Sequence, residues 1–496
     1  MGVVFKDASK ITVISYVGAA IGYLNRILLF TNIFNPAQVG LLNTLINVST
    51  LFGSISSFGV YHVTIKFLPY FNSKENKHHG FLWWIFFLGF AGFLITTIAF
   101  IALKQQISEL YNPQSPLFAS NILYIIPLGF NMLLFGLFDY YLKSLSKNVI
   151  PPFVNEFLFR ILNTLIIVPY FFNYLNFEEF VLLYVTTNSL SGLVLLIYTY
   201  KIGQLFLKPI KSKKIARLMP NMINYGIFLQ TSNITNSLIN NLDILFIAYF
   251  ISMSGNGIYS TMLFLASILL FPYRALSSVS GPLISNYWKN NNRIAIQDLY
   301  SKVSTVGLIA GVVLFALLWT NFQHLFNFIP KEYEAGKYIF LFIALARLTD
   351  IYGGINTLIL TTSKKFRVDF YFNFIYLAAA FLTMFFLIPK YQLIGASIAV
   401  FITFMVVNFT RFIYLYFVFG FNPLQWKQTI PLLALMAVFI LNEIIPVGQR
   451  SIFIDLPIRS LIVLVLILLP VYYFKVSDDF NFHLNRMIKK YLNLNL

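Results

Sequence analysis

Residues 81–103 read FLWWIFFLGFAGFLITTIAFIAL, an apolar stretch without a single charged residue. About twenty apolar residues in an α-helix, rising 1.5 Å per residue, cross the roughly 30 Å hydrocarbon layer of a bilayer. Similar blocks recur throughout the 496 residues, of which 58% are hydrophobic and 10% are charged. A soluble domain carries about a quarter charged residues, and a membrane β-barrel shows ten-residue alternation instead of long blocks. The composition therefore predicts an all-α polytopic membrane protein.

The apolar blocks between charged or Pro- and Asn-rich breaks predict about fourteen transmembrane helices. Their expected bounds are 11–31, 38–60, 81–103, 117–142, 151–171, 179–200, 221–250, 256–280, 300–322, 337–361, 368–388, 392–418, 428–447 and 457–474. The first block exceeds the about 7 to 15 apolar residues of a secretory signal, so we expect an uncleaved helix.

Cations are concentrated in alternate connections between these helices, of which residues 201–220 form the longest basic one. Arg411 is assigned to this basic side and Arg459 to the opposite side. Because lysine and arginine are retained on the cytoplasmic side of a membrane, both termini are expected in the cytoplasm. Residues 201–220 and the tail, 476–496, are expected to lie as amphipathic segments on the anionic cytoplasmic leaflet.

A weak internal repeat divides the chain into two similar halves. Short turns lead into Val39-Gly40-Leu41 in the first half and into Asn256-Gly257-Ile258-Tyr259 in the second. The two copies are six spans apart, so the halves are expected to be parallel repeats, as in two-lobed transporters. Chance similarity within an apolar sequence is the alternative. The expected organisation is an N-terminal lobe (1–200), a basic linker (201–220), a C-terminal lobe (221–418), two further helices (419–475) and the tail (476–496).

Four arginines lie inside the expected membrane helices, namely Arg26, Arg160, Arg274 and Arg347. A guanidinium at the bilayer centre costs about 2.5 to 3.5 kcal/mol, so residues of this kind are usually functional. A guanidinium is planar, stays protonated and donates bidentate hydrogen bonds to phosphate oxygens. The four arginines are therefore predicted to bind a diphosphate.

The neighbours of these arginines in the sequence distinguish two pairs. Arg26 and Arg274 have no acidic residue within one helical turn, and Arg274 follows Pro272, which can kink the helix. They are the preferred phosphate ligands, and an interhelical salt bridge to Asp139 or Asp243 is the alternative. For the other two, pairing within the helix is the alternative, between Glu156 and Arg160 and between Arg347 and Asp350.

Buried acids suggest a site for a coupling cation, Na⁺ or H⁺. Asp243 in the seventh span is the preferred residue, Asp369 and Asn373 are spaced i and i+4 at the start of the eleventh, and Asp139 is a further possibility. Polar side chains in the spans can contact sugars or join helices by hydrogen bonds. They include Asn25, Asn233, Asn236, Asn240 and Tyr225.

Several other classes of function are disfavoured. Cysteine is absent, and no metal site or organic cofactor is expected. The excess of lysine and arginine is explained by membrane topology, so nucleic acid is not an expected partner. A membrane enzyme would need acids or histidines on a sizeable loop, whereas His62 and His324 are isolated in the sequence and His78-His79 lies in a short loop. Gly18 and Gly22 form a small-xxx-small pattern that predicts close helix packing.

Several stretches together resemble the oligosaccharide-lipid and polysaccharide flippases of the multidrug/oligosaccharidyl-lipid/polysaccharide exporter superfamily, the O-antigen type in particular. They are GAAIGYLNR (18–26), VGLL (39–42), FLPYF (67–71), HHGF (78–81), DIL (243–245), GIYS (257–260) and the block 338–356.

The resemblance implies a flippase of the bacterial inner membrane with two six-helix lobes and alternating access. It would move a polyprenyl-diphosphate-linked oligosaccharide outward for surface polysaccharide or lipopolysaccharide assembly, beside polymerase or glycosyltransferase partners. Lipid II flippases of this superfamily carry functional arginines on their first and eighth helices, which Arg26 and Arg274 resemble. Helices 13 and 14 would form a lipid-tail groove or only pack on the second lobe. A cation-coupled drug exporter of the same superfamily is the alternative function, and a polysaccharide-processing enzyme is a weaker one.

Overall fold

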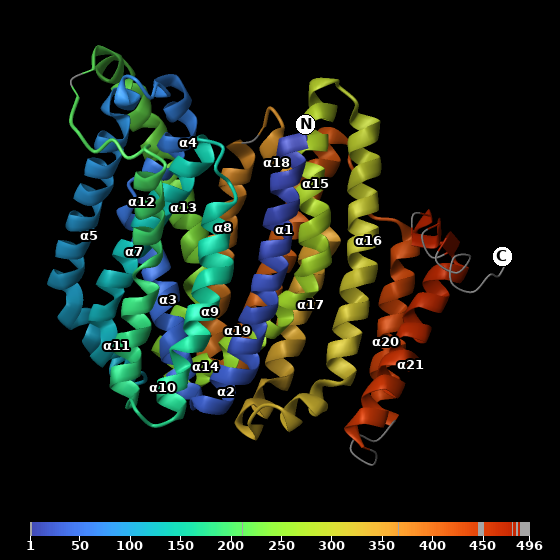
Figure 1. The fold of residues 1–496 in the computed structure, drawn as a ribbon. Helices are drawn as coiled ribbons and strands as arrows, with labels where there is room; N and C mark the ends of the chain where they lie inside the picture. Colours follow the sequence, from blue (N-terminus) through green and yellow to red (C-terminus); the bar gives the residue numbers. More distant parts are fainter. Residues whose placement is uncertain are drawn as a thin grey trace. The chain divides into compact units, whose positions relative to one another are not determined.

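The computed structural model describes residues 2–210, 212–365, 367–444, 451–478, 480–482 and 485–486. Within these ranges the chain is helical and has no β-strand (Figure 1). The predicted all-α fold class is confirmed. Residues 487–496 of the expected tail and 445–447 of the thirteenth expected span lie outside the described ranges.

The first six expected spans are helical, and several consist of consecutive segments. These segments are α1 (Gly2–Tyr23), η1 (Leu24–Leu29), α2 (Phe30–Ile33), α3 (Pro36–Ser56), α4 (Val60–Phe71), η2 (Lys77–Gly80), α5 (Phe81–Tyr111), α6 (Pro116–Asn121), η3 (Ile122–Tyr124), α7 (Ile125–Ser144), α8 (Ile150–Pro152), η4 (Phe153–Leu158), α9 (Phe159–Leu165), α10 (Ile167–Phe171), α11 (Phe177–Asn188) and α12 (Ser191–Lys201). A capping box sets the start of α3, because the Asn35 side chain accepts a hydrogen bond from the Gln38 backbone N–H at 2.9 Å and the Gln38 side chain accepts one from the Asn35 N–H at 3.1 Å.

The second half continues the helical pattern. Its segments are α13 (Lys213–Phe250), α14 (Met253–Ala266), η5 (Ser267–Leu269), α15 (Leu270–Lys289), α16 (Arg293–Thr320), η6 (Phe322–Asn327), η7 (Lys331–Gly336), α17 (Lys337–Gly353), α18 (Asn356–Thr362), α19 (Arg367–Phe419), η8 (Trp426–Gln428), α20 (Thr429–Ile444) and α21 (Ile452–Tyr473). α13 begins before its expected start, so residues 213–220 of the expected linker belong to this helix.

α19 contains both the eleventh and the twelfth expected spans. Its 53 residues are interrupted at Gln392, where φ is 53° and ψ is −136°. The two arms run back along each other, since the hydroxyl oxygens of Thr383 and Thr403 lie 3.2 Å apart. α19 is therefore an antiparallel helical hairpin that supplies two spans.

The number of spans agrees with the expectation of about fourteen. Ten helices of the described chain are long and apolar enough to cross a membrane, and the bent pair Lys331–Gly353 and Asn356–Thr362 adds an eleventh. The second arm of α19, the short α20 and the Asn-rich α13 supply the others.

The chain forms two compact units, residues 1–260 and 261–496. The boundary falls within α14, after the expected linker, because α13 packs on α3, α4 and α5 of the first unit. In the second unit α20 and α21 contact each other and α16 (Figure 1). The lobe bounds expected from the sequence remain a prediction.

Two helices that correspond in the internal repeat, α3 and α14, cross at their glycines. A Cβ on Gly40 would collide with the Met253 carbonyl oxygen, and one on Gly257 would collide with that of Pro36. Asn43 Nδ2 donates a 2.9 Å hydrogen bond to Ser260 Oγ, and these residues are 217 positions apart, as are Gly40 and Gly257. Equivalent residues thus meet across a local pseudo-twofold axis, the arrangement of an isologous contact. Whether the two halves are a true repeat stays a prediction.

A strap formed by residues 203–210 lies against one end of the first unit and is held by a histidine. His78 is buried, its Nε2 lies 2.9 Å from Gln204 Oε1, and its Nδ1 accepts a hydrogen bond from the Ser73 N–H. Tyr141 donates a 2.8 Å hydrogen bond to the Gln204 carbonyl oxygen, and Ile210 lies against Gly80. His78 therefore anchors the basic connection.

Replacing His78 by alanine should release the strap. The variant removes the hydrogen-bond partner of the half-buried Gln204 side chain, a net loss of about 0.5 to 1.5 kcal/mol. We expect faster limited cleavage by chymotrypsin after Phe206, within the strap, measured on the purified protein in detergent. His79→Ala is the matched control, since His79 contacts the Phe71 ring and has no hydrogen bond to the strap within the described residues. Equal cleavage rates in the two variants would contradict the anchoring role.

Candidate functional site

The first membrane helix becomes π-helical at Arg26. This segment, η1, has a counterpart in the fifth span, where η4 is also π-helical. Single π-helical turns within α-helices are frequent at functional sites. α1 packs against η4 and α9, and η1 packs against α9. Both irregular segments therefore belong to one interface within the first unit.

Asn25 joins the two sides of this interface. Its Nδ2 donates a 2.9 Å hydrogen bond to the Arg160 carbonyl oxygen, and its Oδ1 accepts one of 2.9 Å from Thr164 Oγ1. The side chain is buried. Of the two roles expected for Asn25, these contacts favour the interhelical one.

Two guanidinium groups gather here with one carboxylate. Arg160 Nη2 lies 2.5 Å from Glu156 Oε2, so the pairing expected within the fifth span is confirmed. The Arg160 guanidinium lies over Gly22, where a side chain would displace it. Arg26 is close enough to Arg160, Tyr184 and Tyr23 for electrostatic interaction. These contacts bring two guanidinium groups and the Glu156 carboxylate together at one interface.

The small-residue pattern of α1 provides a test of this interface. A Cβ on Gly18 would collide with the Glu156 carbonyl oxygen, a backbone atom that cannot move away alone. We expect Gly18→Ala to lower the unfolding free energy by about 1 to 3 kcal/mol, as overpacking does. The measurement is thermal unfolding followed by tryptophan fluorescence. Gly281→Ala is the matched control, because nothing lies within 4 Å of its Cβ position; similar loss in both variants would contradict the assigned contact.

In the second unit, Arg347 and Asp350 lie near each other without forming the expected direct pair. The Arg347 guanidinium lies 5.2 Å from the centre of the Phe404 ring, and its buried Nε has no hydrogen-bond partner within the described residues. Asp350 is bonded to Asn408 and interacts electrostatically with Arg347, Arg411 and Arg274. Within the described residues the two side chains form no direct ion pair, but Arg347 is the charge that acts most strongly on Asp350, so their mutual neutralisation stays a prediction.

Arg274 lies on α15, just after a break in the eighth span. The 3₁₀ turn η5 precedes α15, and Pro272 occupies its first turn, where no backbone N–H is required. The helix irregularity expected near Arg274 is present as η5, which ends before Pro272. The Arg274 side chain is exposed, and within the described chain it forms no ion pair. It is thus accessible to a ligand.

Asp369 and Asn373, the pair considered for a coupling cation, face Arg411. Arg411 Nη2 lies 3.0 Å from Asp369 Oδ1 and 3.2 Å from Asn373 Oδ1. All three residues are buried. A guanidinium therefore already occupies the position considered for Na⁺ or H⁺. Arg411, which the sequence assigned to the basic side of the membrane, is buried, because the return arm of the hairpin brings it against Asp369.

Asp243 and Asp139 have different surroundings in the first unit. Asp243 is 7% exposed and accepts a 2.8 Å hydrogen bond from Tyr259. Next to it, Asn256 donates to Thr44 Oγ1 at 2.8 Å, within the crossing of α3 and α14. Asp139 instead forms a 2.7 Å ion pair with Lys143. Of the two, Asp243 has the buried, hydrogen-bonded environment expected of a coupling carboxylate.

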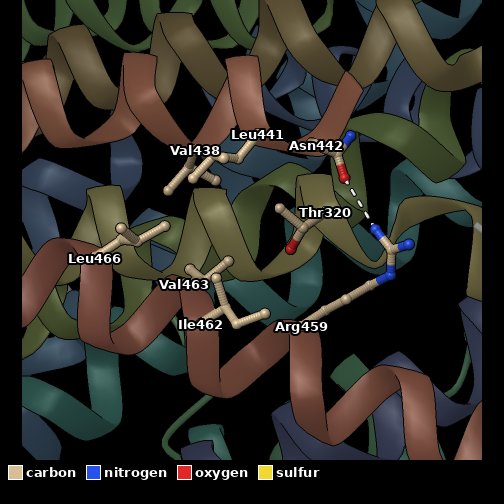
Figure 2. A pocket seen from close by; sticks show the side chains of 8 residues that line it. All are labelled: Thr320, Val438, Leu441, Asn442, Arg459, Ile462, Val463 and Leu466. Carbon is tan, nitrogen blue, oxygen red and sulfur yellow. Dashed lines mark hydrogen bonds between the residues drawn. The ribbon is translucent and has the colours of Figure 1, made fainter. Parts of the chain in front are cut away.

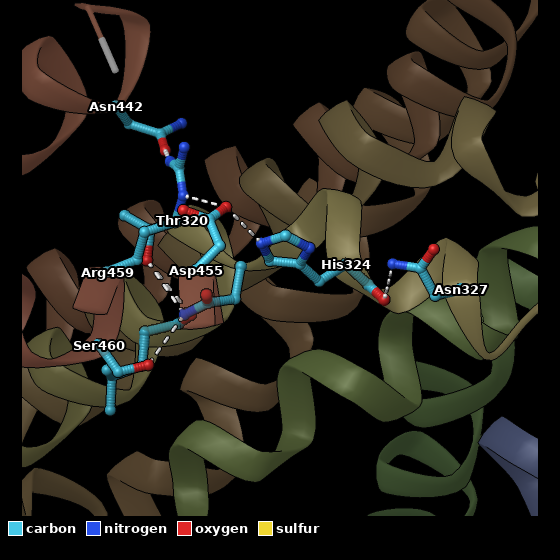
Figure 3. A network of polar contacts seen from close by, with 9 residues as sticks. Thr320, His324, Asn327, Asn442, Asp455, Arg459 and Ser460 are labelled. Atoms are coloured by element: carbon cyan, nitrogen blue, oxygen red, sulfur yellow. Dashed lines mark hydrogen bonds and ion pairs between the residues drawn. The ribbon is translucent and has the colours of Figure 1, made fainter. Parts of the chain in front are cut away.

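A third charged cluster joins α21 to η6. Asp455 Oδ2 accepts hydrogen bonds of 2.9 Å from both His324 Nε2 and Arg459 Nε, and Arg459 Nη1 donates to Asn442 Oδ1 at 3.4 Å (Figure 3). His324 is therefore not isolated, and Arg459, which the sequence assigned to the side opposite the basic one, is buried. The i and i+4 spacing of Asp455 and Arg459 could have predicted their ion pair. The contact between His324 and Asp455 spans 131 residues, so no local spacing indicates it.

The space beside this cluster is small. A cavity of about 20 Å³ lies among α16, α20 and α21, with Arg459 reaching Asn442 at one end (Figure 2). Its other walls are Thr320, Val438, Leu441, Ile462, Val463 and Leu466. This volume holds about one water molecule.

Sequence comparison identifies the family. A family model described as "Polysaccharide biosynthesis protein" matches residues 4–288, more than half of the chain. The chain belongs to this polysaccharide biosynthesis family. Among curated relatives, this family member is 27% identical over 146 residues to the capsular polysaccharide biosynthesis protein CapF of Staphylococcus aureus, covering 29% of the chain and 37% of that relative. It is also 24% identical over 416 residues to the uncharacterized membrane protein MJ1068 of Methanocaldococcus jannaschii. This match covers 77% of the chain and 78% of MJ1068.

Solved structures share the fold of this polysaccharide biosynthesis family member. The lipid II flippase MurJ, in an inward closed conformation, superposes with a TM-score of 0.71 at 12% identity, covering 94% of this chain and 99% of MurJ. An inward-facing multidrug resistance MATE transporter gives a TM-score of 0.59 at 11% identity. This superposition covers 85% of this chain and 96% of the transporter. At these identities the fold alone is shared. The structures are those of a flippase and a transporter, not of enzymes.

Proposed function

We propose that this family member is a flippase that moves a polyprenyl-diphosphate-linked oligosaccharide from the inner to the outer leaflet by alternating access. Membership of the polysaccharide biosynthesis family and a fold shared with a flippase and a multidrug transporter support translocation of a lipid-linked substrate over catalysis. The setting is surface polysaccharide synthesis, of the O-antigen or exopolysaccharide type, in a bacterial inner membrane with both chain ends in the cytoplasm. Polymerase and glycosyltransferase proteins are the proposed neighbours.

The observation that carries the proposal is the gathering of guanidinium groups in two clusters, one within each unit. In the first unit, Arg26 and Arg160 accompany Glu156. In the second, Arg274, Arg347 and Arg411 accompany Asp350 and Asp369. A diphosphate carries the negative charge and the acceptor oxygens that guanidinium groups of this kind bind. Each charge-assisted hydrogen bond contributes about 1.5 to 3 kcal/mol.

The sugar part of the substrate would meet the polar side of α13. Asn236 and Asn240 are exposed there, and Asn240 donates only to the Asn236 carbonyl oxygen of its own helix. Their remaining donors and acceptors are available to hydroxyl groups. For the driving ion, H⁺ or Na⁺, Asp243 is the proposed carboxylate of the first unit and Asp350 that of the second. Asp369 is not proposed, since Arg411 fills its site.

A reconstituted transport assay tests this function. Purified protein in liposomes would be supplied with a fluorescent polyprenyl-diphosphate oligosaccharide, its monophosphate analogue and, separately, a cationic dye. We expect translocation of the diphosphate substrate at least about tenfold faster than that of the monophosphate, because one charge-assisted contact is lost. Protein-free liposomes give the background rate. Transport of the dye without the diphosphate lipid would instead identify a cation-coupled drug exporter.

A further inference from the structure

A large cavity opens at the basic end of the first unit, away from the arginine cluster. Its volume is about 930 Å³, and it is lined by the start of α5, the end of the strap and the first turns of α13. The apolar lining residues are Trp84, Ile210, Ile215, Ala216, Met219, Pro220 and Ile223. A cavity of this size accommodates a molecule of several hundred daltons.

The walls of this cavity are held in place by the fold. Ile215 is buried, and Ile210 lies against Gly80 at the start of α5. The strap itself is anchored through His78 and Gln204. The cavity is therefore preformed, which lowers the entropic cost of binding.

The polar side of the cavity is basic. Ser212, Lys213 and Asn224 complete its lining, and the Lys213 side chain is exposed. Residues 201–224 contain no acidic residue, and Arg217 is exposed on the same helix. Lys214 is directed elsewhere, with its Nζ 5.8 Å from the Phe71 ring centre. An apolar cavity with a cation at its mouth matches an amphiphile with an anionic head group.

We infer that this cavity binds one anionic phospholipid, with its phosphate at Lys213 and Ser212 and acyl carbons along Trp84, Met219 and Ile223. Two observations favour a phospholipid over a soluble anion. Most of the lining is apolar, which a free phosphate would not use. Trp84 is a residue type that settles at the membrane interface, the depth of phospholipid head groups. This lipid site is distinct from the transport site and does not depend on the proposed substrate.

Lipid binding can be measured by native mass spectrometry of the purified, delipidated protein. Phosphatidylglycerol and phosphatidylcholine would be titrated separately. We expect the wild-type protein to retain one phosphatidylglycerol in preference to phosphatidylcholine. Lys213→Gln should weaken phosphatidylglycerol binding about fivefold, the equivalent of about 1 kcal/mol for one interfacial cation. Ala216→Phe, at an exposed position lining the cavity, should weaken both lipids by filling the space.

Two controls test whether the phospholipid binds in this cavity. Lys208 is exposed on the same basic strap but does not line the cavity, so Lys208→Gln should leave binding unchanged. Brominated phosphatidylglycerol should quench tryptophan fluorescence saturably, and this component should disappear in the Trp83→Phe/Trp84→Phe variant. Equal losses in the Lys208 and Lys213 variants would mean diffuse surface attraction and overturn the proposal. Displacement of the phospholipid by an equimolar polyprenyl diphosphate would overturn it as well, by assigning the cavity to the transported lipid.

Discussion

Replacing Arg26 by alanine should slow translocation of the polyprenyl-diphosphate substrate by about ten- to hundredfold. The expected loss is one charge-assisted contact to a phosphate oxygen, about 1.5 to 3 kcal/mol. Arg26→Lys should recover part of the rate, since an ammonium group keeps the charge but not the planar bidentate geometry. The assay is initial transport rate in liposomes containing equal amounts of folded protein.

Arg274→Ala provides a second arm of the same test. The Arg274 side chain is exposed and forms no ion pair in the described chain, so its removal should lower transport without lowering the unfolding temperature. Arg293→Ala is the matched control, because Arg293 is exposed at the start of α16, outside both clusters. Full transport activity in both the Arg26 and Arg274 variants would exclude these residues as phosphate ligands.

Replacing Asp369 by asparagine should destabilise the second unit strongly, by about 3 to 5 kcal/mol. The change leaves the Arg411 guanidinium buried without its carboxylate, which is the costly way to break a buried ion pair. The pair also fastens the open end of the α19 hairpin, remote from the turn at Gln392. Thermal unfolding in detergent, followed by tryptophan fluorescence, measures the effect.

The double variant Asp369→Leu/Arg411→Met distinguishes the cost of an unpaired buried guanidinium from the loss of the ion pair itself. Removing both charges at once eliminates the uncompensated guanidinium, so stability should return close to the wild-type value. Lys302 and Asp298 form an exposed ion pair 2.9 Å apart on α16, and Asp298→Asn is the matched control with an expected loss below about 1 kcal/mol. An Asp369→Asn variant as stable as the Asp298→Asn control would contradict the structural role of the pair.

Much of the fold was predictable because a bilayer imposes a length and a polarity on every helix that crosses it. Residues 81–103 gave an expected span that lies entirely within α5. The pairing of Glu156 with Arg160 followed from helical spacing alone. These predictions succeeded because they rest on hydropathy and on contacts within one or two helical turns.

Contacts between distant parts of the chain were not predictable in this way. Arg411 stood near the end of an expected span, and only the fold-back at Gln392 brings it to Asp369. His324 meets Asp455 across 131 residues. His78 appeared to lie in an ordinary loop, although it anchors the strap through Gln204. No periodicity in the sequence encodes which helix lies opposite such a side chain.

The amino-acid sequence by itself determined that this chain is a bundle of membrane helices with arginines in apolar surroundings, because hydropathy and helical spacing are local properties. Tertiary structure alone decided which charges neutralise one another. It joins Arg160 and Arg26 in one cluster, places Arg411 where a cation was expected, and leaves Arg274 exposed. The physical reason is that a buried charge takes its partner from whichever helix packs against it, and that packing depends on the whole chain.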